Sequence, residues 1–318
     1  MKRLLNFLFP VVDLVLLPFV YPAAVMLKTV RRIGVRRLRN CKRALLQVGV
    51  FPIRDHYYEP LFNARNLGRP LNESRSLPGI DWNVRGQLVL LEKFTFADEL
   101  RDIPRRGDKT TLHIDNGFFE AGDAEYLYNI IRLMKPRRII EIGSGQSTLM
   151  AAKATTRNRL ETPDYSCKHV CIEPYENRWL EKIGVTVIRQ PVEQIERSFF
   201  RQLGERDLLF IDSSHMIKPQ GDVLAEYLEI LPSLAPGVIV HIHDIFSPRD
   251  YPENWVFDEV RLWNEQYLVE AFLTGNRDWK IIGLLNFLHH NHYEALKAKC
   301  PFLTKQNEPG SLYLQRVS

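Results

Sequence analysis

The chain has 318 residues, of which 45% are hydrophobic and 25% charged, which is typical of one large folded domain with appendages or of two domains. Its net charge of +5 is concentrated in residues 1–43, where ten Lys or Arg stand against one acid, so the remaining chain is mildly acidic. This distribution argues against a nucleic-acid-binding groove in the body, and four irregularly spaced cysteines argue against a disulfide framework or a zinc site.

Residues 1–43 are predicted to form a membrane-associating arm. The stretch 4–27 is strongly apolar with one charge, and its length is close to the roughly 20 residues that a helix needs to cross a bilayer. Three prolines interrupt it, so a clean span and a kinked or interfacial element both remain open. Residues 28–43 carry eight positive charges and no negative ones, which favours the cytoplasmic face of a membrane. The alternative is a basic helix that packs on the body or contacts RNA.

Residues 44–114 are predicted to be an irregular cap or substrate-facing region. Prolines, glycines and aromatic residues are frequent there, and no strong helical period runs through the segment. We therefore expect little regular structure before residue 115, where the pattern changes.

Residues 115–318 alternate between helical patterns and short apolar runs. This alternation predicts an α/β fold with a Rossmann-like, doubly wound, mostly parallel sheet of seven strands. The expected strands are 138–143, 169–173, 185–189, 208–212, 238–244, 279–287 and 312–317, and the clearest helices are 123–134, capped by Asp123, 149–155 and 221–231.

Polar residues stand where several of these strands end. In such sheets, ligands bind beyond the carboxyl ends of the strands. Glycines follow the first strand in the turn Gly143-Ser144-Gly145, which lets a ligand approach the backbone and the N–H groups of the next helix. Position 148 is Thr, where a dinucleotide-binding turn has a third glycine. Glu173 ends the second strand and can accept hydrogen bonds from both ribose hydroxyls of an adenosine.

At these residues the chain resembles the class I methyltransferases that use S-adenosylmethionine (SAM). Glu141-Ile142-Gly143-Ser144-Gly145-x-Ser147-Thr148 is similar to their first motif, and 210–215 and 241–246 resemble a bacterial branch that modifies small molecules, sugars and natural products. The resemblance covers about residues 115–290. It implies SAM as the cofactor, bound by Glu141, Gly143, Ser144, Gly145, Ser147, Thr148, Glu173 and Asp212. The segment 190–193 matches the family's adenine-contacting motif poorly, and no residue is carried over there.

Two chemistries fit the ends of the fourth and fifth strands. Methyl transfer to oxygen requires alignment of two reactants and removal of a hydroxyl proton. Asp212 and Asp244 suit Mg²⁺, but Ile245 stands where metal-dependent catechol-type relatives have a third ligand, so His243 is the candidate replacement. The alternative is a histidine base, His215 or His243, beside Asp212. The choice between metal and base stays open.

The sequence therefore predicts a SAM-dependent, O-directed methyltransferase that acts on a saccharide, a lipid-linked glycan or another small-molecule metabolite. Competing hypotheses are a hydroxylase-like or nicotinamide-linked enzyme on the same fold, and a catalytically silent scaffold anchored at a membrane. Residues 248–255 are expected to form either the acceptor wall or a packed connection. His241 is expected to be a hydrogen-bonded core residue, and the histidines of 289–292 are expected to lie on a surface turn.

Overall fold

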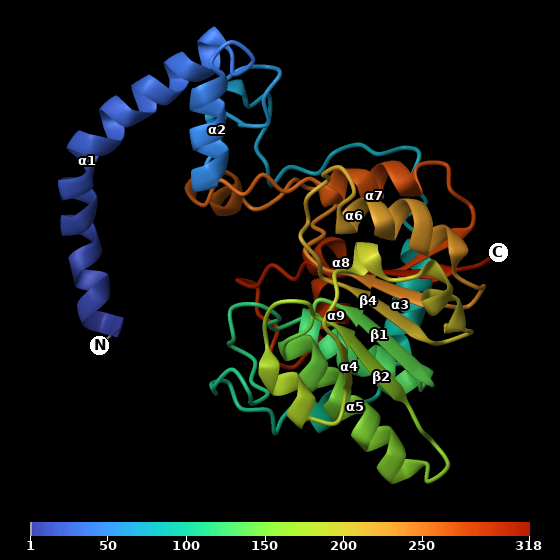
Figure 1. The fold of residues 1–318 in the computed structure, drawn as a ribbon. Helices are drawn as coiled ribbons and strands as arrows, with labels where there is room; N and C mark the ends of the chain where they lie inside the picture. Colours follow the sequence, from blue (N-terminus) through green and yellow to red (C-terminus); the bar gives the residue numbers. More distant parts are fainter. Residues whose placement is uncertain (1) are drawn as a thin grey trace. The chain divides into compact units, whose positions relative to one another are not determined.

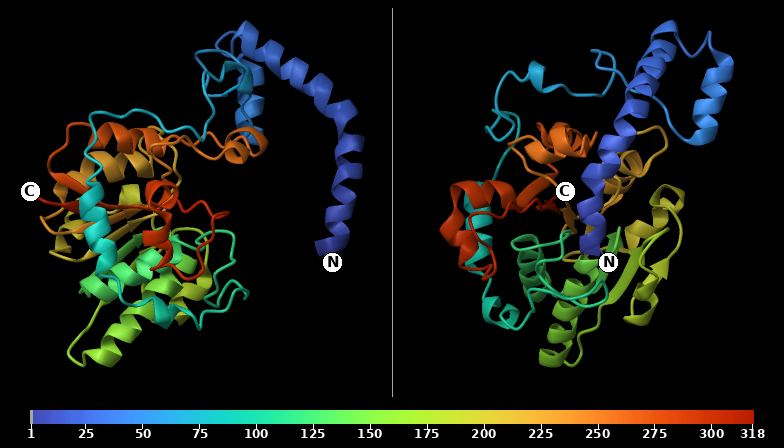
Figure 2. Two further views of the ribbon diagram at one scale, coloured as in Figure 1. Left: turned by 180° about the vertical axis from the view of Figure 1, so that it is seen from behind. Right: turned by 90° about the vertical axis from the view of Figure 1, so that its left-hand side faces the viewer.

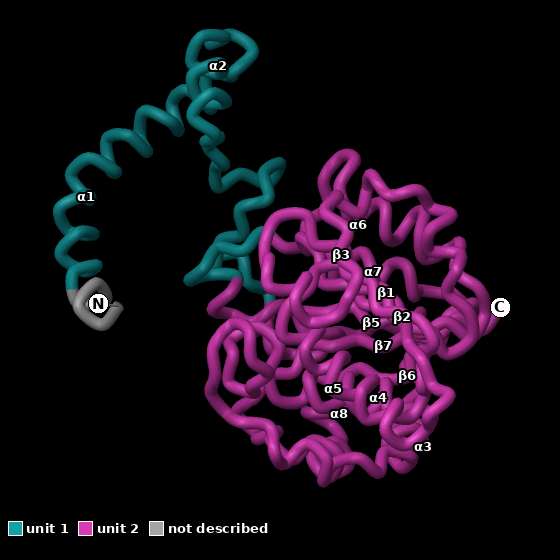
Figure 3. Tube along the Cα trace, turned by 60° about the horizontal axis from the view of Figure 1, so that its bottom comes forward, with its two compact units in different colours: residues 1–68, 256–262 teal, residues 69–255, 263–318 magenta. Residues whose placement is uncertain are grey.

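The computed structural model describes residues 2–318, with side chains from residue 8 onward, and divides into two compact units (Figure 3). Unit 1 contains the residues up to 68 together with 256–262, and unit 2 contains 69–255 and 263–318. The boundaries expected at 43 and 114 do not coincide with this division. Residues 69–114 belong to the same unit as the predicted body, because they supply part of its core.

Unit 1 consists mainly of two helices and an irregular segment. Helix α1 spans Lys2–Ile33, α2 spans Arg39–Val48, and a short 3₁₀ helix, η1, spans Ala64–Asn66. Within α1, residues 8–33 are long and apolar enough to cross a membrane, although a signal sequence near an N-terminus has the same properties. The Glu59 carboxylate joins the helix to the irregular segment, since it accepts hydrogen bonds from Arg31 at 3.0 Å and from Arg54 at 3.2 Å.

Unit 2 is built on the predicted seven-stranded sheet, with strand order β3-β2-β1-β4-β5-β7-β6 (Figure 1). Strands β1 to β5 pair in parallel, and β7 runs antiparallel to both β5 and β6. The mostly parallel sheet is thus confirmed. The strands span Arg138–Ile142 (β1), Lys168–Ile172 (β2), Thr186–Ile188 (β3), Leu208–Ile211 (β4), Ile239–Ile242 (β5), Trp279–Leu284 (β6) and Leu312–Arg316 (β7).

Helices cover both faces of the sheet because successive strand residues point to opposite sides. On β1, Ile139 belongs to one apolar cluster and Ile140 to the other. The first face carries α3 (Val84–Glu92), α4 (Asp123–Met134), α5 (Gln146–Glu161), α8 (Leu285–Asn291) and α9 (Tyr293–Lys297); the second carries α6 (Asp222–Ala225) and α7 (Glu265–Leu273) (Figures 1 and 2). Short 3₁₀ helices lie at 97–100, 178–182, 192–194, 197–202 and 231–233, and π-helical turns at 226–230 and 254–258.

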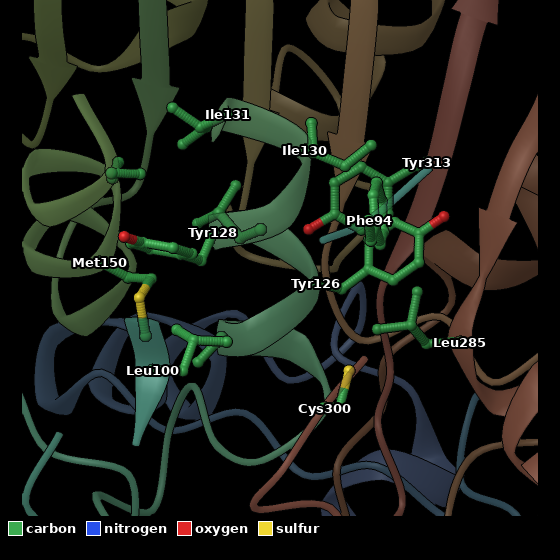
Figure 4. Packing of buried hydrophobic residues seen from close by; sticks show 14 of the residues in the cluster. Phe94, Leu100, Tyr126, Tyr128, Ile130, Ile131, Met150, Leu285, Cys300 and Tyr313 are labelled. Carbon is green, nitrogen blue, oxygen red and sulfur yellow. The ribbon is translucent and has the colours of Figure 1, made fainter. Parts of the chain in front are cut away.

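Tyr126 on α4 is a fully buried member of the first cluster and packs beside Phe94 and Tyr313 (Figure 4). Its ring contacts those of Phe94 and Tyr313, with centroids 5.0 and 4.7 Å away, and its hydroxyl donates to the Ile282 carbonyl at 2.9 Å. Phe94 follows α3. The sequence did not predict this helix, because no strong helical period runs through residues 44–114. Residues 69–114 therefore pack against α4 through Phe94. The N-terminus of α4 borders the site described below.

Three local expectations differ from the structure. The cap of α4 is Gly122, whose N–H is accepted by Glu125 at 2.9 Å, so Asp123 does not cap the helix. Helix α5 starts at Gln146, earlier than expected, because the Thr148 hydroxyl accepts the Gly145 N–H at 3.1 Å. The expected surface turn at 289–292 is wrong: strand β6 stops at Leu284, and α8 then buries His289 on its inner face.

Candidate active site

Two hollows lie beyond the carboxyl ends of the parallel strands, on either side of Asp212 and Asp244. The first, here called the strand-end cavity, has a volume of about 320 Å³ and is lined by residues that follow β1 to β4, among them Gly143, Glu173 and Asp212. The second, here called the Asp244 hollow, has a volume of about 280 Å³ and includes Asp244 in its lining. Asp212 and Asp244 thus line separate hollows, but their carboxylate oxygens and a His215 nitrogen lie within 4.8 Å of one another.

Gly143 makes the turn that forms the floor of the strand-end cavity. Its φ of +76° lies in the left-handed region, and a β-carbon at this position would lie 1.9 Å from the Asp212 carbonyl oxygen. Hydrogen bonds hold both sides of this close approach, from Gly143 N–H to Ile172 at 3.1 Å and from Asp212 N–H to Ile142 at 2.8 Å. The turn and the end of β4 are thus one packed unit.

Glu173 is held in place by backbone donors. One carboxylate oxygen accepts the N–H groups of Tyr175 at 3.2 Å and Glu176 at 2.9 Å, and the other lies 3.4 Å from the Ser144 nitrogen. Each oxygen has lone pairs left over, and the side chain lines the cavity. A pre-oriented carboxylate at this place can accept hydrogen bonds from two neighbouring hydroxyls of a ligand.

Five of the eight residues predicted to bind the cofactor do not line the cavity: Glu141, Ser144, Gly145, Ser147 and Thr148. Of these, Glu141, Ser147 and Thr148 are buried beneath the turn. Glu141 is fully buried and accepts hydrogen bonds from the Thr148 hydroxyl at 2.7 Å and from the Cys171 thiol at 3.4 Å. The Glu141 side chain therefore stabilises the glycine turn from beneath it. Ser144 and Gly145 belong to the turn itself, and the Ser144 carbonyl accepts a hydrogen bond from Asn177 at 2.7 Å.

The segment after β3 also lines the strand-end cavity, which the motif comparison missed. Pro191, Val192 and Glu193 contribute to its wall, as do Ser213, Ser214 and Lys218 after β4. The signal was present in the sequence, since these residues directly follow predicted strands, where ligands bind in this fold.

His215 lies between three carboxylates. Its Nδ1 is 2.8 Å from Glu265 Oε2, and its Nε2 is 3.3 Å from Asp212 Oδ1 and 3.6 Å from Asp244 Oδ2. Since a carboxylate accepts, Nδ1 carries a proton, and Nε2 is the nitrogen that faces the strand ends. Both His215 and Asp244 have φ near +57°, an uncommon backbone conformation that clusters at functional sites.

The carboxylates control the charge of this histidine. Burial alone would lower the pKa of His215, but hydrogen bonds to Asp212 and Glu265 raise that pKa well above its ordinary value. The pKa of Asp212 is lowered, because the attraction of His243 and His215 outweighs the loss of solvent around its carboxyl group. The arrangement favours an imidazolium surrounded by carboxylates, which makes the neutral imidazole a strong proton acceptor.

Glu265 was not predicted. It is the first residue of α7 and is fully buried, and its second oxygen accepts the Tyr227 hydroxyl at 2.9 Å. The Trp263 ring packs on His215 with centroids 4.3 Å apart. Fifty residues separate Glu265 from His215 in the chain, so no local pattern connects them.

His243, the predicted third metal ligand and alternative base, is placed differently. Its Nε2 lies 3.3 Å from the Phe118 carbonyl, which can only accept, so this nitrogen carries a proton. Among the described residues, the side chains whose ligand atoms converge on one point here are Asp212, His215 and Asp244, all within 4.8 Å of one another. The structure thus replaces His243 with His215 in that set. His241 is a core residue, as expected, and lies 2.9 Å from the Ser311 hydroxyl.

The part of the chain that forms this site is similar to known proteins. A family model described as a methyltransferase domain matches residues 140–245, which contain the glycine turn, Glu173, His215 and Asp244. A protein of Archaeoglobus fulgidus, described only as uncharacterized, is 30% identical over 164 residues, which are 47% of this chain and 72% of the relative.

Two solved structures show more distant likeness. The O-methyltransferase TomG from Streptomyces achromogenes, involved in tomaymycin synthesis and solved with SAM, is 18% identical with a TM-score of 0.39; the match covers 72% of this chain and 90% of that chain. A TDP-rhamnose 3′-O-methyltransferase of calicheamicin biosynthesis is 13% identical with a TM-score of 0.38; the match covers 60% of this chain and 76% of that chain.

Proposed function

Because the chain belongs to the class I methyltransferases, which use SAM, we propose that it methylates an oxygen atom of a small-molecule acceptor, with His215 as the general base. The observation that carries this proposal is the position of His215 Nε2 between Asp212, which borders the strand-end cavity, and Asp244, which borders the Asp244 hollow. A proton acceptor between two adjoining ligand sites is what transfer to a hydroxyl group requires.

The strand-end cavity fits SAM by the chemistry of its lining. Bound there, SAM supplies an electrophilic methyl group on a sulfonium. Glu173 would accept the ribose hydroxyls, the segment 191–193 would cover the adenine, and the turn at Gly143 would leave room for the rest of the molecule. The close approach of Gly143 to Asp212, which a β-carbon would block, supports this assignment.

On the acceptor side, His215 would take the hydroxyl proton at Nε2. Glu265 would keep the other ring proton on Nδ1 and stabilise the resulting imidazolium, as the orienting carboxylate does in catalytic triads. Tyr227 in turn fixes Glu265. Asp212 and Asp244 would share the positive charge.

Mg²⁺ binding by the same cluster is the second candidate mechanism. Two carboxylates and one imidazole within 4.8 Å are a suitable donor set, and Glu265 would orient His215 as outer carboxylates commonly do for metal-bound histidines. A bound ion would lower the pKa of the acceptor hydroxyl. Metal removal separates the two mechanisms, as described in the Discussion.

The first test is titration of SAM and S-adenosylhomocysteine into the detergent-solubilised full chain. Glu173→Gln is expected to weaken binding by about 10- to 100-fold, because it replaces charge-assisted hydrogen bonds to two hydroxyls with neutral ones. The matched control is Glu196→Gln, an exposed position outside the cavity lining, with expected wild-type affinity. Equal binding by wild type and Glu173→Gln would contradict the proposed ribose site.

We also propose that α1 attaches the enzyme to the cytoplasmic face of a membrane, and that the acceptor is a saccharide, a lipid-linked glycan or a similar metabolite. Leu14 and Leu17 are exposed on α1. Changing both to Asp is expected to move most of the protein from the carbonate-resistant membrane fraction to the soluble fraction, since each charge at a helix centre costs about 3 kcal/mol in the bilayer. Leu228→Asp, at an exposed leucine of unit 2, is the control. A membrane fraction unchanged in the double variant would refute attachment through α1.

A further inference from the structure

The lining of the Asp244 hollow has a strong chemical bias. Carboxylates come from four residues, amides from three and aromatic rings from three, and no Lys or Arg occurs among the described residues that line it. The acids are Glu120, Asp123, Asp244 and Glu308; the amides are Asn254, Gln306 and Asn307; the aromatic residues are Phe118, Phe246 and Trp255. His243 also lines the hollow, where burial alone would lower its pKa but Asp244 and Asp212 raise it above the ordinary value, and Glu308 pairs with His290 at 2.8 Å. Carboxylates still outnumber these cations, so the surface repels anions and offers many hydrogen-bond acceptors.

Two buried side chains in this lining have unsatisfied polar atoms. Asp123 is 6% exposed and His243 is 4% exposed, and neither Asp123 Oδ1 nor His243 Nδ1 has a hydrogen-bond partner within the described part of the chain. Buried polar atoms are nearly always paired in folded proteins, and each unpaired one costs free energy. Both atoms are closed to solvent, so they mark the inner wall of the hollow as a polar one that is short of partners. A hydroxyl group both donates and accepts, so it can pair with the carboxylates and amides that line the hollow, and this lining favours a ligand that brings hydroxyl groups.

The size and position of the hollow limit that ligand further. At about 280 Å³ the hollow lies at the lower end of small-molecule pockets, which suits one ring rather than a chain of several. Asp244 links the hollow to the base, since its Oδ2 is 3.6 Å from His215 Nε2. The rings of Phe246 and Trp255 stand edge to face at 5.2 Å and give the hollow an apolar wall. A ring with apolar C–H faces and polar hydroxyl edges matches both kinds of lining.

We propose that the Asp244 hollow binds a single hydroxylated ring that is uncharged or carries an amine, such as one sugar residue, and that it excludes rings bearing a carboxylate or phosphate. This inference rests on the proposed function, which makes the hollow the acceptor site. A carboxylate or phosphate on the ligand would be repelled by the carboxylates of the lining, and each such like-charge pair is expected to lower the affinity several-fold. Hydroxyl and ammonium groups instead donate charge-assisted hydrogen bonds to the same carboxylates. Any phosphate of a lipid-linked acceptor would therefore have to lie outside the hollow.

Three ligands with the same pyranose ring and the same 4-nitrophenyl aglycone test this charge selectivity. They are the 4-nitrophenyl β-D-glycosides of glucose, glucosamine and glucuronic acid, titrated into the detergent-solubilised full chain in the presence of S-adenosylhomocysteine. The glucoside and the glucosaminide are expected to bind at least about tenfold more tightly than the glucuronide. Equal or tighter binding of the glucuronide would overturn the proposal.

Variants of the lining assign any selectivity to this hollow. Glu120→Gln and Glu308→Gln are expected to reduce the ratio of glucuronide to glucoside dissociation constants, because each removes one negative charge from the lining. Glu294→Gln, an exposed position outside the lining, is expected to leave the ratio unchanged. A ratio unaffected by the lining variants would also overturn the proposal. If S-adenosylhomocysteine binds but no glycoside does, this inference fails and the proposed function stands; if S-adenosylhomocysteine does not bind, the proposed function itself fails.

Discussion

Glu265→Gln is expected to lower kcat by about 10²- to 10⁴-fold, the usual contribution of an oriented general base, while SAM affinity stays unchanged. The substitution keeps the shape of the side chain but removes the charge 2.8 Å from His215 Nδ1. A glutamine can present its NH₂ to Nδ1 and thereby favour the wrong tautomer, with the proton on Nε2. The imidazolium formed during the reaction would also lose its closest counter-charge.

The pH dependence of the reaction distinguishes this mechanism from loss of stability. The pKa of His215 is raised well above 6.5, and only the neutral imidazole accepts a proton, so kcat is expected to rise with pH through a limb above pH 6.5. Glu265→Gln removes one of the groups that raise this pKa, and the limb is therefore expected to move to lower pH. The control is Glu270→Gln, which lies on the same helix but pairs with Arg75. This variant can change the melting temperature, but it is expected to leave the limb of the kcat–pH profile at the wild-type pH.

Metal removal decides between base and ion. If His215 acts as the base, enzyme treated with EDTA keeps its kcat; if Mg²⁺ binds Asp212, His215 and Asp244, kcat collapses and returns when Mg²⁺ is added. A Glu265→Gln enzyme with wild-type kcat and an unmoved pH limb would remove His215 from the chemistry altogether.

Much of the fold was predictable because its signals are local. Short apolar runs bounded by turns predicted all seven strands, and the polar residues at their ends predicted which edge of the sheet carries the site. Helix α3 was missed because residues 69–114 interleave one amphipathic helix with turns, and because its burial depends on contacts with β6 and α9, far along the chain.

The site was predicted less completely because its partnerships are long-range. Motif position alone could not show that Glu141 supports the turn from below while Glu173 faces the cavity, since both are glutamates near the ends of predicted strands and both are buried. Choosing between His215 and His243 needed the partners of each ring nitrogen. Glu265 binds one of the His215 nitrogens, and the Phe118 carbonyl lies against one of the His243 nitrogens.

Gly143→Ala is expected to weaken SAM binding by about 100-fold or more, equivalent to roughly 3 kcal/mol, and to lower the melting temperature. Two effects act together at this residue. A φ of +76° is strained for alanine, and the new methyl group would lie 1.9 Å from the Asp212 carbonyl oxygen, a contact that only a shift of the main chain can relieve. That shift would move Asp212 away from both the strand-end cavity and His215, so kcat is expected to fall as well.

Gly145→Ala separates this steric effect from a general intolerance of the turn. The nearest atom to a β-carbon at Gly145 is Asn177 Nδ2, at 3.9 Å, and its φ of −177° lies outside the left-handed region that favours glycine. Its melting temperature is therefore expected to match that of the wild type. Calorimetric titration of SAM and thermal melting of both variants give the comparison. If Gly143→Ala bound SAM as tightly as the wild type, the turn between β1 and α5 could not be the floor of the cofactor site, and the assignment of the strand-end cavity would have to be abandoned.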